Sequence, residues 1–321
     1  MENLYLDLTN PNPSSFLEIN YKISSFPDGQ KTIDILPDPS SRIGGKKLSG
    51  MFNPKYVSGV TISSRMNSME DVGLIVCANQ ALRELGAKKV SLYVPYFLGA
   101  RSDRKFVEGG INFLKTVICP IINSQKFDSV NVVDPHSDVL EACLNNFHKV
   151  TNVKLVDFAI NDYMSTYPVG KDKVVLVSPD AGALKKVFHV AEEIHFKNEI
   201  VIASKHRDLV SGKITRTDVP LNETHKGKDF FILDDICDGG RTFIEIAKVL
   251  HKEQPESKVY LVVTHGIFSA GFRELSQYFD GIYCTDSIKN IEARVLEEFF
   301  DLEGKPESAL VETKVKQLKV F

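Results

Sequence analysis

The chain has 321 residues, of which 43% are hydrophobic and 25% charged, with a formal net charge of −3. This composition is typical of a globular protein, and the length favours two domains. The weak negative charge argues against nucleic acid or an anionic membrane as a partner, and no apolar run approaches the roughly 18 to 20 residues that span a bilayer. Met1–Leu4 lacks signal-peptide features, and the five cysteines are scattered. We therefore expect a cytoplasmic protein without disulfides or zinc.

The first part of the chain carries short strand-like segments around a turn. The pattern predicts strands at 4–8, 16–23 and 32–36. The turn is Phe26-Pro27-Asp28-Gly29-Gln30, as its Pro, Asp and Gly indicate. It is either a plain hairpin turn or a purine platform, in which Phe26 stacks on the base and Asp28 accepts from an amino group. Residues 37–55, rich in Pro, Ser, Gly and Lys, are expected to form a surface loop.

The next stretch, up to about residue 150, alternates strands and helices. Strands are predicted at 57–62, 90–94 and 130–133, and helices at 71–85, 111–122 and 139–147. The second of these strands leads into the basic loop Arg101–Lys105, and the third into Asp134-Pro135-His136. A charged run is often a solvated face, but ligands of open α/β sheets bind beyond the carboxyl ends of strands. His136, between acids, is either an isolated surface histidine or a candidate for Mg²⁺ binding or proton transfer.

A second α/β unit follows. Strands are predicted at 173–177, 200–203, 230–233, 258–264 and 281–284, helices at 184–193, 270–279 and 291–299 and after Phe243, and a hairpin at 209–219. Asp180 comes directly after the first of these strands, and Lys205 and Arg207 follow the second. The last twenty residues show no pattern. The predicted fold is α/β with two domains and mostly parallel sheets, spanning residues 1–152 and 153–300, with a tail at 301–321.

The stretch Phe230–Thr242 organises the chain. Four apolar residues form a buried strand, two carboxylates (Asp234 and Asp235) follow, and Asp238-Gly239-Gly240 leads into a helix. A glycine-containing loop at a helix start lets backbone N–H groups approach a phosphate. Carboxylates beside it suit a ligand with hydroxyls or a bound Mg²⁺ ion. This stretch therefore predicts a phosphosugar site, whereas the alternative is an ordinary turn with solvated acids.

Polar sets at the ends of five strands indicate a site for several phosphates, yet no Walker or kinase glycine-rich motif occurs. The ordered set resembles the ribose-phosphate pyrophosphokinases (phosphoribosyl diphosphate synthetases), from about residue 24 to 287. The motifs that carry this resemblance are Phe26–Gln30, Pro95–Lys105, Val133–His136, Ser178–Gly182, Lys205–Arg207, Phe230–Thr242 and Thr264–Ser269.

The resemblance implies two phosphoribosyltransferase-like (Rossmann-like) domains and an Mg²⁺-dependent diphosphokinase. Such an enzyme transfers the β,γ-diphosphoryl group of ATP to ribose 5-phosphate, releasing AMP and supplying nucleotide and NAD synthesis. It also implies a cytoplasmic homo-oligomer, a dimer or hexamer, in which the adenine site is completed by a neighbouring subunit.

The resemblance further implies roles for individual residues. ATP would be bound by Phe26, Asp28, Gln30, Arg101, Ser102, Asp103 and Arg104. The catalytic residues would be Lys205, Arg207 and His136, and the Mg²⁺ ligands His136 and Asp180. Ribose phosphate would be bound by Asp180, Asp234, Asp235, Asp238, Gly239, Gly240, Arg241 and Thr242.

The acceptor loop departs from the family pattern at two places. Gly239 stands where Thr is usual, and Arg241 where the second Gly is usual. Less bulk and an added bidentate cation would suit an esterified ribose phosphate such as ADP-ribose, as in NAD salvage. The plainer alternative is that Arg241 faces solvent or pairs with an acid, and ribose 5-phosphate is the acceptor. Two other classes also stay open: a phosphoribosyltransferase and a non-catalytic regulatory relative.

Overall fold

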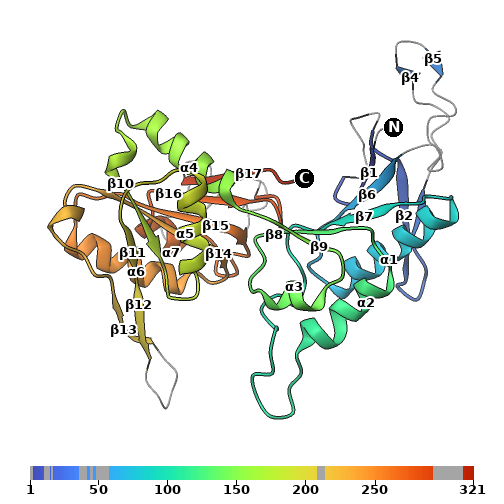
Figure 1. The fold of residues 1–321 in the computed structure, drawn as a ribbon, viewed down its shortest axis with the longest axis horizontal. Helices are drawn as coiled ribbons and strands as arrows, with labels where there is room; N and C mark the ends of the chain where they lie inside the picture. The colour runs from blue at the N-terminus through green and yellow to red at the C-terminus, as the bar shows by residue number, and fades with distance from the viewer. Residues whose placement is uncertain are drawn as a thin grey trace. The chain divides into compact units, whose positions relative to one another are not determined.

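The computed structural model describes residues 3–10, 15, 17–35, 42–43, 46–47, 58–207, 214–291 and 314–321. The chain divides into two compact units, Met1–Val150 with Phe321 and Thr151–Val320 (Figure 1). Each unit is built around its own parallel sheet and its own core. The predicted α/β class with mostly parallel sheets is confirmed. In the part of the chain that is described, no helix combines the length and apolarity needed to cross a membrane.

The N-terminal unit has a five-stranded sheet of order β1-β6-β7-β8-β9, in which every neighbouring pair is parallel. Its strands are β1 (Asn3–Asp7), β6 (Gly59–Ser63), β7 (Val90–Tyr93), β8 (Val130–Val133) and β9 (Phe147–Val150). Its helices are α1 (Met69–Glu84), α2 (Cys119–Ser124) and α3 (Val139–Cys143). Helix α1 begins at a capping box between Ser68 and Asp71 and buries Val72, Ile75 and Leu82 against the sheet.

Two helix predictions in this unit differ from the structure, one in its hydrogen-bond pattern and one in its length. The helix expected at 111–122 is a π-helical turn, Leu114–Ile118, followed by α2, whose first residues include Pro120. Proline lacks an N–H and cannot donate into a regular helical ladder, which accounts for the change from π-helical to α-helical hydrogen bonding within a continuous helical segment. The helix expected at 139–147 ends at Cys143. Asn146 there has a positive φ of 53°, and the chain turns into β9, a strand that was not predicted.

Small antiparallel hairpins complete the described part of this unit. Strands β2 (Tyr21–Ser25) and β3 (Lys31–Ile35) form one, and the short β4 (Arg42–Ile43) and β5 (Lys46–Lys47) form another. The predicted turn at Phe26–Gln30 therefore joins two paired strands, as expected. Most of the surface loop predicted at 37–55 lies outside the described residues.

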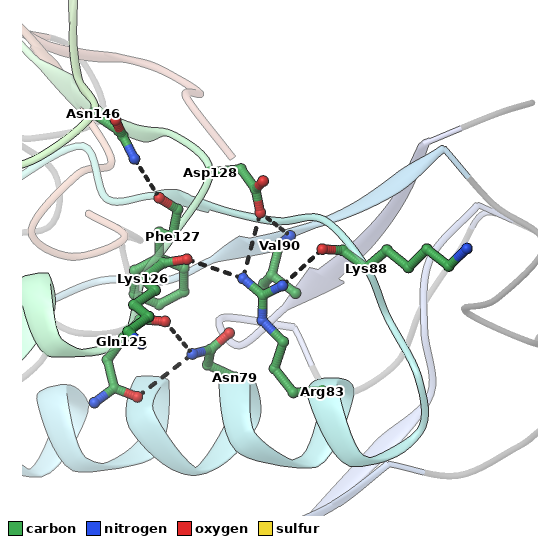
Figure 2. Close-up of polar contacts among 9 residues, drawn as sticks. All are labelled: Asn79, Arg83, Lys88, Val90, Gln125, Lys126, Phe127, Asp128 and Asn146. Carbon is green, nitrogen blue, oxygen red and sulfur yellow. Dashed lines mark hydrogen bonds and ion pairs between the residues drawn. The ribbon is translucent and has the colours of Figure 1, made fainter.

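A polar network holds the amino ends of β7 and β8 to helix α1 (Figure 2). The Arg83 guanidinium donates to the backbone carbonyls of Lys88 at 2.8 Å and Lys126 at 3.0 Å. It also lies 3.4 Å from Asp128 Oδ2, which accepts a 2.8 Å hydrogen bond from the backbone N–H of Val90. One arginine thus joins the helix to both loops that begin neighbouring strands. The carboxyl ends of β7 and β8 take no part in this network.

We expect Arg83→Ala to lower the free energy of unfolding by about 1–3 kcal/mol, because it leaves two carbonyls and a carboxylate without this donor. Lys88→Ala is the matched control, because only the backbone carbonyl of Lys88 takes part, and Figure 2 shows its side chain extending away from the network. Denaturant unfolding of both variants measures the difference. Equal stability of the two variants would contradict the assignment.

The C-terminal unit has a six-stranded parallel sheet of order β11-β10-β14-β15-β16-β17. Its strands are β10 (Val174–Ser178), β11 (Ile200–Ile202), β14 (Asp229–Cys237), β15 (Val259–Gly266), β16 (Gly281–Thr285) and β17 (Val315–Leu318). Its helices are α4 (Val153–Thr166), α5 (Leu184–Glu193), α6 (Arg241–Glu253) and α7 (Arg273–Tyr278). An antiparallel hairpin, β12 (Ser204–Arg207) with β13 (Ile214–Asp218), follows β11 and extends below this sheet in Figure 1.

Strand β14 is the central strand that its apolar run predicts. Phe230 and Ile232 belong to the core that α6 and α7 cover, whereas Phe231 and Leu233 belong to the core beneath α4 and α5. Both faces of the strand are therefore buried, which explains why its sequence does not alternate between apolar and polar residues.

Helix α4 and strands β12 and β17 were not predicted from the sequence, and the hairpin expected at 209–219 begins earlier, at Ser204. Helix α4 is formed by the first residues of the unit, and β17 is an edge strand formed by the C-terminal stretch that shows no sequence pattern. The helix predicted at 291–299 lies outside the described residues. The helix predicted at 184–193 is confirmed as α5.

The strand order of the C-terminal unit reverses direction once. After β10 the chain moves outward to β11, then returns to place β14 on the other side of β10. In open α/β sheets such a reversal opens a crevice at the carboxyl ends of the two strands, and ligands bind there. In the N-terminal unit the described strands of the main sheet follow one another in sequence order.

Candidate active site

The reversal point of the C-terminal unit is flanked by three acidic residues. Asp180 follows β10, and Asp234 and Asp235 lie near the end of β14, which pairs with β10 in parallel register at Val177 and Ile232. Asp180 Oδ1 accepts hydrogen bonds from the backbone N–H groups of Gly182 at 3.0 Å and Ala183 at 3.1 Å, just before α5 begins. The fold thus gathers these three predicted residues at one crevice.

The two carboxyl groups on β14 have different surroundings. Asp235 is 4% exposed and forms a 2.8 Å ion pair with Lys186 Nζ of α5. Asp234 is half-buried, and its Oδ1 accepts the backbone N–H of Asp235 at 2.9 Å. Burial, followed by the negative charges of Asp235 and Asp180, raises the pKa of Asp234 well above its usual value. This arrangement favours a ligand that offers hydroxyl donors or a cation.

The loop after β14 is held in one shape from two sides. The Ser269 hydroxyl donates to Asp238 Oδ1 at 2.6 Å, and the Ser269 N–H donates to the Asp238 carbonyl at 3.2 Å. Gly240, the residue that precedes α6, has a φ of +79°, and a Cβ there would lie 2.8 Å from Leu275 of α7. Both the backbone angle and the contact therefore require glycine at this position.

This loop leads directly into helix α6, so the amino end of the helix lies at the crevice. Arg241 and Thr242 form the first turn of α6, and Arg241 is exposed. The first N–H groups of a helix lack partners within the helix, and together with the helix dipole they attract anions. Asp238 to Thr242 therefore form a phosphate cradle next to the carboxyl pair of β14. This is the geometry expected for a phosphosugar.

Lys205 and Arg207 lie in the β12–β13 hairpin, where their backbones pair with Thr217 and Ile214. Because β11 runs parallel to β10, the hairpin leaves the sheet from the edge that carries Asp180. The structure describes the backbone of these two residues but not their side chains. Their catalytic roles stay a prediction.

The predicted ATP-phosphate and histidine residues share one sheet edge in the N-terminal unit. β7 leads into the loop that carries Arg101, Ser102, Asp103 and Arg104, and β8, its parallel neighbour, leads to His136. Arg101, Arg104 and His136 are exposed. Asp134, the first residue after β8, is buried and has a positive φ of 40°. Such backbone strain in a non-glycine residue is concentrated at functional sites.

The predicted adenine residues lie at the tip of the β2–β3 hairpin. Phe26 is 54% exposed. Asp28 Oδ1 accepts the backbone N–H of Gln30 at 3.1 Å, which shapes the turn. The hairpin is a sheet of its own, separate from the β7 and β8 loops. An exposed ring at a projecting turn is suited to contact a base or another protein surface.

The predicted Mg²⁺ ligands do not form a ready-made cage. Within the described ranges no group of three or more His, Cys, Asp or Glu side chains is placed to hold a metal ion. His136 belongs to the N-terminal unit and Asp180 to the C-terminal unit. Mg²⁺ in phosphate-transferring sites is usually held by one or two carboxylates together with substrate phosphates. Asp180 would supply one such carboxylate to an ion that arrives with the nucleotide, and the role of His136 stays a prediction.

Two residues of this site were missed by the sequence analysis: Lys186 and Ser269. Lys186 lies six residues after Asp180, in the first turn of α5, and only the pairing of β10 with β14 reveals its contact with Asp235. Ser269 belongs to a motif that supports the family resemblance, but no role was assigned to it. The signal that could have identified Lys186 is a polar residue in the first turn of the helix that follows an acidic residue at a strand end.

The site of the C-terminal unit defines a class of protein. Residues 147–295 match the family model of the phosphoribosyl transferase domain. This span includes the carboxyl pair, the phosphate cradle and the hairpin. The C-terminal unit thus has the domain that the sequence of β14 and its loop predicts.

The similarity to particular proteins extends over most of the chain. The ribose-phosphate pyrophosphokinase of Pyrococcus furiosus is 28% identical over 84% of this chain and 86% of its own length, and that of Pyrococcus abyssi is 27% identical over 79% and 78%. The crystal structure of phosphoribosylpyrophosphate synthetase from Mycobacterium smegmatis matches with a TM-score of 0.72 at 14% identity, over 100% of this chain and 95% of that one, which shows a shared fold. The chain is thus similar to ribose-phosphate pyrophosphokinases over most of its length, and the resemblance drawn from its motifs is confirmed.

Proposed function

We propose that this protein transfers the β,γ-diphosphoryl group of ATP to the anomeric hydroxyl of ribose 5-phosphate, giving phosphoribosyl diphosphate and AMP. The observation that carries this proposal is the crevice of the C-terminal unit. A carboxyl pair at the end of β14 adjoins a phosphate cradle at the start of α6, in a chain similar to ribose-phosphate pyrophosphokinases over most of its length. The product would supply nucleotide and NAD synthesis in the cytoplasm.

The acceptor is bound by the crevice. The 5-phosphate lies on the loop from Asp238 to Thr242, where backbone N–H groups and the dipole of α6 neutralise its charge. Asp234 and Asp235 accept hydrogen bonds from the ribose hydroxyls, which removes part of the cost of holding two carboxyl groups together. The anomeric hydroxyl then projects away from the phosphate.

The donor is bound by the residues of the N-terminal unit. Arg101 and Arg104 contact the ATP phosphates. The carbonyls of Ser102 and Asp103 shape their loop by accepting hydrogen bonds from the Leu114 N–H at 3.1 Å and the Asn112 side-chain amide at 2.5 Å. Phe26, Asp28 and Gln30, on an exposed hairpin tip, hold the adenine of ATP in a neighbouring subunit of a homo-oligomer, a dimer or hexamer. His136 and Asp180 are the predicted ligands of a Mg²⁺ ion, which would neutralise phosphate charge when bound.

The transfer step is an in-line displacement. The anomeric oxygen forms a bond to the β-phosphorus while the bond from that phosphorus to the oxygen bridging it to the α-phosphate breaks, so AMP leaves with that oxygen and the hydroxyl proton is released. Lys205 and Arg207 neutralise charge on the transferred group. Such a reaction depends on positioning and charge stabilisation more than on covalent catalysis.

ADP-ribose is a second candidate acceptor, and the cradle itself favours it. A Cβ at Gly239 would meet nothing closer than the Ser269 hydroxyl at 3.8 Å, so glycine leaves open space there that packing does not require. Arg241 is exposed beside this space. An esterified phosphate would fit the gap, with the guanidinium on the second phosphate.

Formation of AMP from ATP tests both candidates. We expect AMP release with ribose 5-phosphate that is abolished by a chelator and restored by Mg²⁺. If ADP-ribose is an acceptor, Arg241→Gly lowers kcat/KM for ADP-ribose more than for ribose 5-phosphate. If Arg241→Gly leaves the ratio of the two kcat/KM values unchanged, Arg241 has no role in acceptor choice. Absence of AMP with either acceptor, in a folded protein supplied with Mg²⁺, eliminates the proposed activity and favours a phosphoribosyltransferase or a regulatory protein.

A further inference from the structure

The Lys186–Asp235 ion pair lies in the crevice but has no role in the mechanism above. Lys186 comes from the first turn of α5, and Asp235 from the end of β14, 49 residues further along the chain. The two charged atoms are 2.8 Å apart, and the Asp235 side chain is 6% exposed. A charge-assisted hydrogen bond of this length between shielded groups is among the stronger polar contacts in a protein.

The pair brings a basic side chain, Lys186, to a site that carries three acids. Asp180, Asp234 and Asp235 interact electrostatically, and Lys186 pairs with the most deeply buried of them. Without this cation, Asp235 would be a buried carboxyl group next to two others, and it would either take up a proton or turn away from its neighbours. Lys186 thus holds the Asp235 side chain in a fixed orientation.

The Lys186 ammonium is largely shielded from solvent, as is the Asp235 carboxylate that it contacts. The Lys186 side chain is 20% exposed. The cavity that Lys186 and Asp234 line together with Asn152, Ala183 and Leu233 measures about 10 Å³, room for a single water molecule. A ribose ring does not enter this space. The ion pair with Asp235 is therefore the contact through which Lys186 can act on an acceptor that binds at Asp235.

We infer that Lys186 is a positioning residue for the sugar moiety of the acceptor: its ion pair holds the Asp235 carboxylate ready to accept a ribose hydroxyl, while the phosphate cradle binds independently of it. This inference rests on the proposed function for the identity of the sugar phosphate. It concerns binding, however, and can be measured without turnover.

The test compares ribose 5-phosphate with inorganic phosphate as ligands in calorimetric titrations. We expect Lys186→Met to weaken ribose 5-phosphate binding about 10- to 100-fold, the order for a hydrogen bond to a charged group. Phosphate affinity should change less than about threefold, because the cradle on α6 is separate. Lys186→Arg should keep ribose 5-phosphate affinity within about threefold of wild type. Lys185→Met, at the exposed neighbouring position of α5, is the matched control and should bind as wild type does.

A double-mutant cycle separates positioning from stability. Because Lys186 acts through Asp235, adding Lys186→Met to Asp235→Asn should cause little further loss of ribose 5-phosphate affinity. If Lys186→Met fails to fold, Lys186→Gln takes its place with the same expected loss. Unchanged ribose 5-phosphate affinity, an equal loss for phosphate, or additive losses in the cycle would each overturn the inference.

The same titrations distinguish failure of the inference from failure of the proposed function. If the wild type binds ribose 5-phosphate and Lys186→Met weakens it selectively, the inference stands even when no AMP forms from ATP. If the wild type forms AMP but Lys186→Met retains full affinity for the sugar phosphate, the proposed function stands and the inference fails. A wild type that binds phosphate but not ribose 5-phosphate overturns the inference.

Discussion

Lys205→Ala and Arg207→Ala are each expected to lower kcat by about 10²- to 10³-fold, the order observed when a preorganised charge donor is removed from a transition state. The KM for ATP should change less than about threefold, because these contacts form mainly as charge develops on the transferred group. Steady-state kinetics of AMP formation with ribose 5-phosphate measure both constants.

The hairpin supplies its own control for this experiment. Arg216 lies on β13, pairs with Asp218 of the same strand at 2.5 Å, and is exposed. Arg216→Ala should leave kcat within about twofold of wild type. If this variant loses as much activity as Lys205→Ala, the loss in both variants reflects the fold or net charge of the hairpin. A large rise in the KM for ATP with unchanged kcat would assign Lys205 to substrate binding.

Gly240→Ala is expected to disrupt the phosphate cradle. The backbone there has a φ of +79°, which alanine tolerates poorly, and the added Cβ would lie 2.8 Å from Leu275. We expect a loss of about 1–3 kcal/mol in the free energy of unfolding, as for other residues held in strained backbone regions. We also expect the KM for ribose 5-phosphate to rise at least about tenfold, because the first turn of α6 must shift. Denaturant unfolding and acceptor kinetics measure the two effects.

The neighbouring glycine and the contacted leucine provide the comparisons. Gly239→Ala should change stability by less than about 0.5 kcal/mol, since its Cβ meets no atom closer than 3.8 Å. Combining Gly240→Ala with Leu275→Ala should relieve the steric part of the acceptor defect but not the backbone part. Wild-type stability in Gly240→Ala would show that the loop tolerates a side chain, and the account of the cradle would be wrong.

Several features of the site could be predicted from the sequence because they depend on neighbouring residues. The apolar run Phe230–Leu233 indicates a strand buried on both faces, and Asp238 to Thr242 indicate a turn and a helix start. These are consequences of local hydrophobicity and of backbone conformations that glycine permits. The predicted strand was too short, because β14 continues through Asp234 and Asp235 to Cys237. The order of the motifs also predicted the class of domain, which the family model and the fold confirm.

The sequence predicted the end of one helix and the last strand less well. The helix predicted at 139–147 ends at Cys143, because the chain turns through Asn146 into the edge strand β9. Strand β17 carries no clear alternation, since its partner β16 and the residues around it determine its conformation. In both cases pairing with a distant strand decided the structure.

The sequence by itself determined which residue types stand at the strand ends, and so the phosphosugar chemistry that we propose. Only the tertiary structure decided how they combine. The return of β14 to the side of β10 creates the crevice, brings Lys186 to within 2.8 Å of Asp235, and leaves Asp234 with a raised pKa. Ser269 reaches Asp238 from the loop after a different strand. These contacts join residues 31 to 49 positions apart, and they arise from the pairing of whole strands, which short-range patterns do not encode.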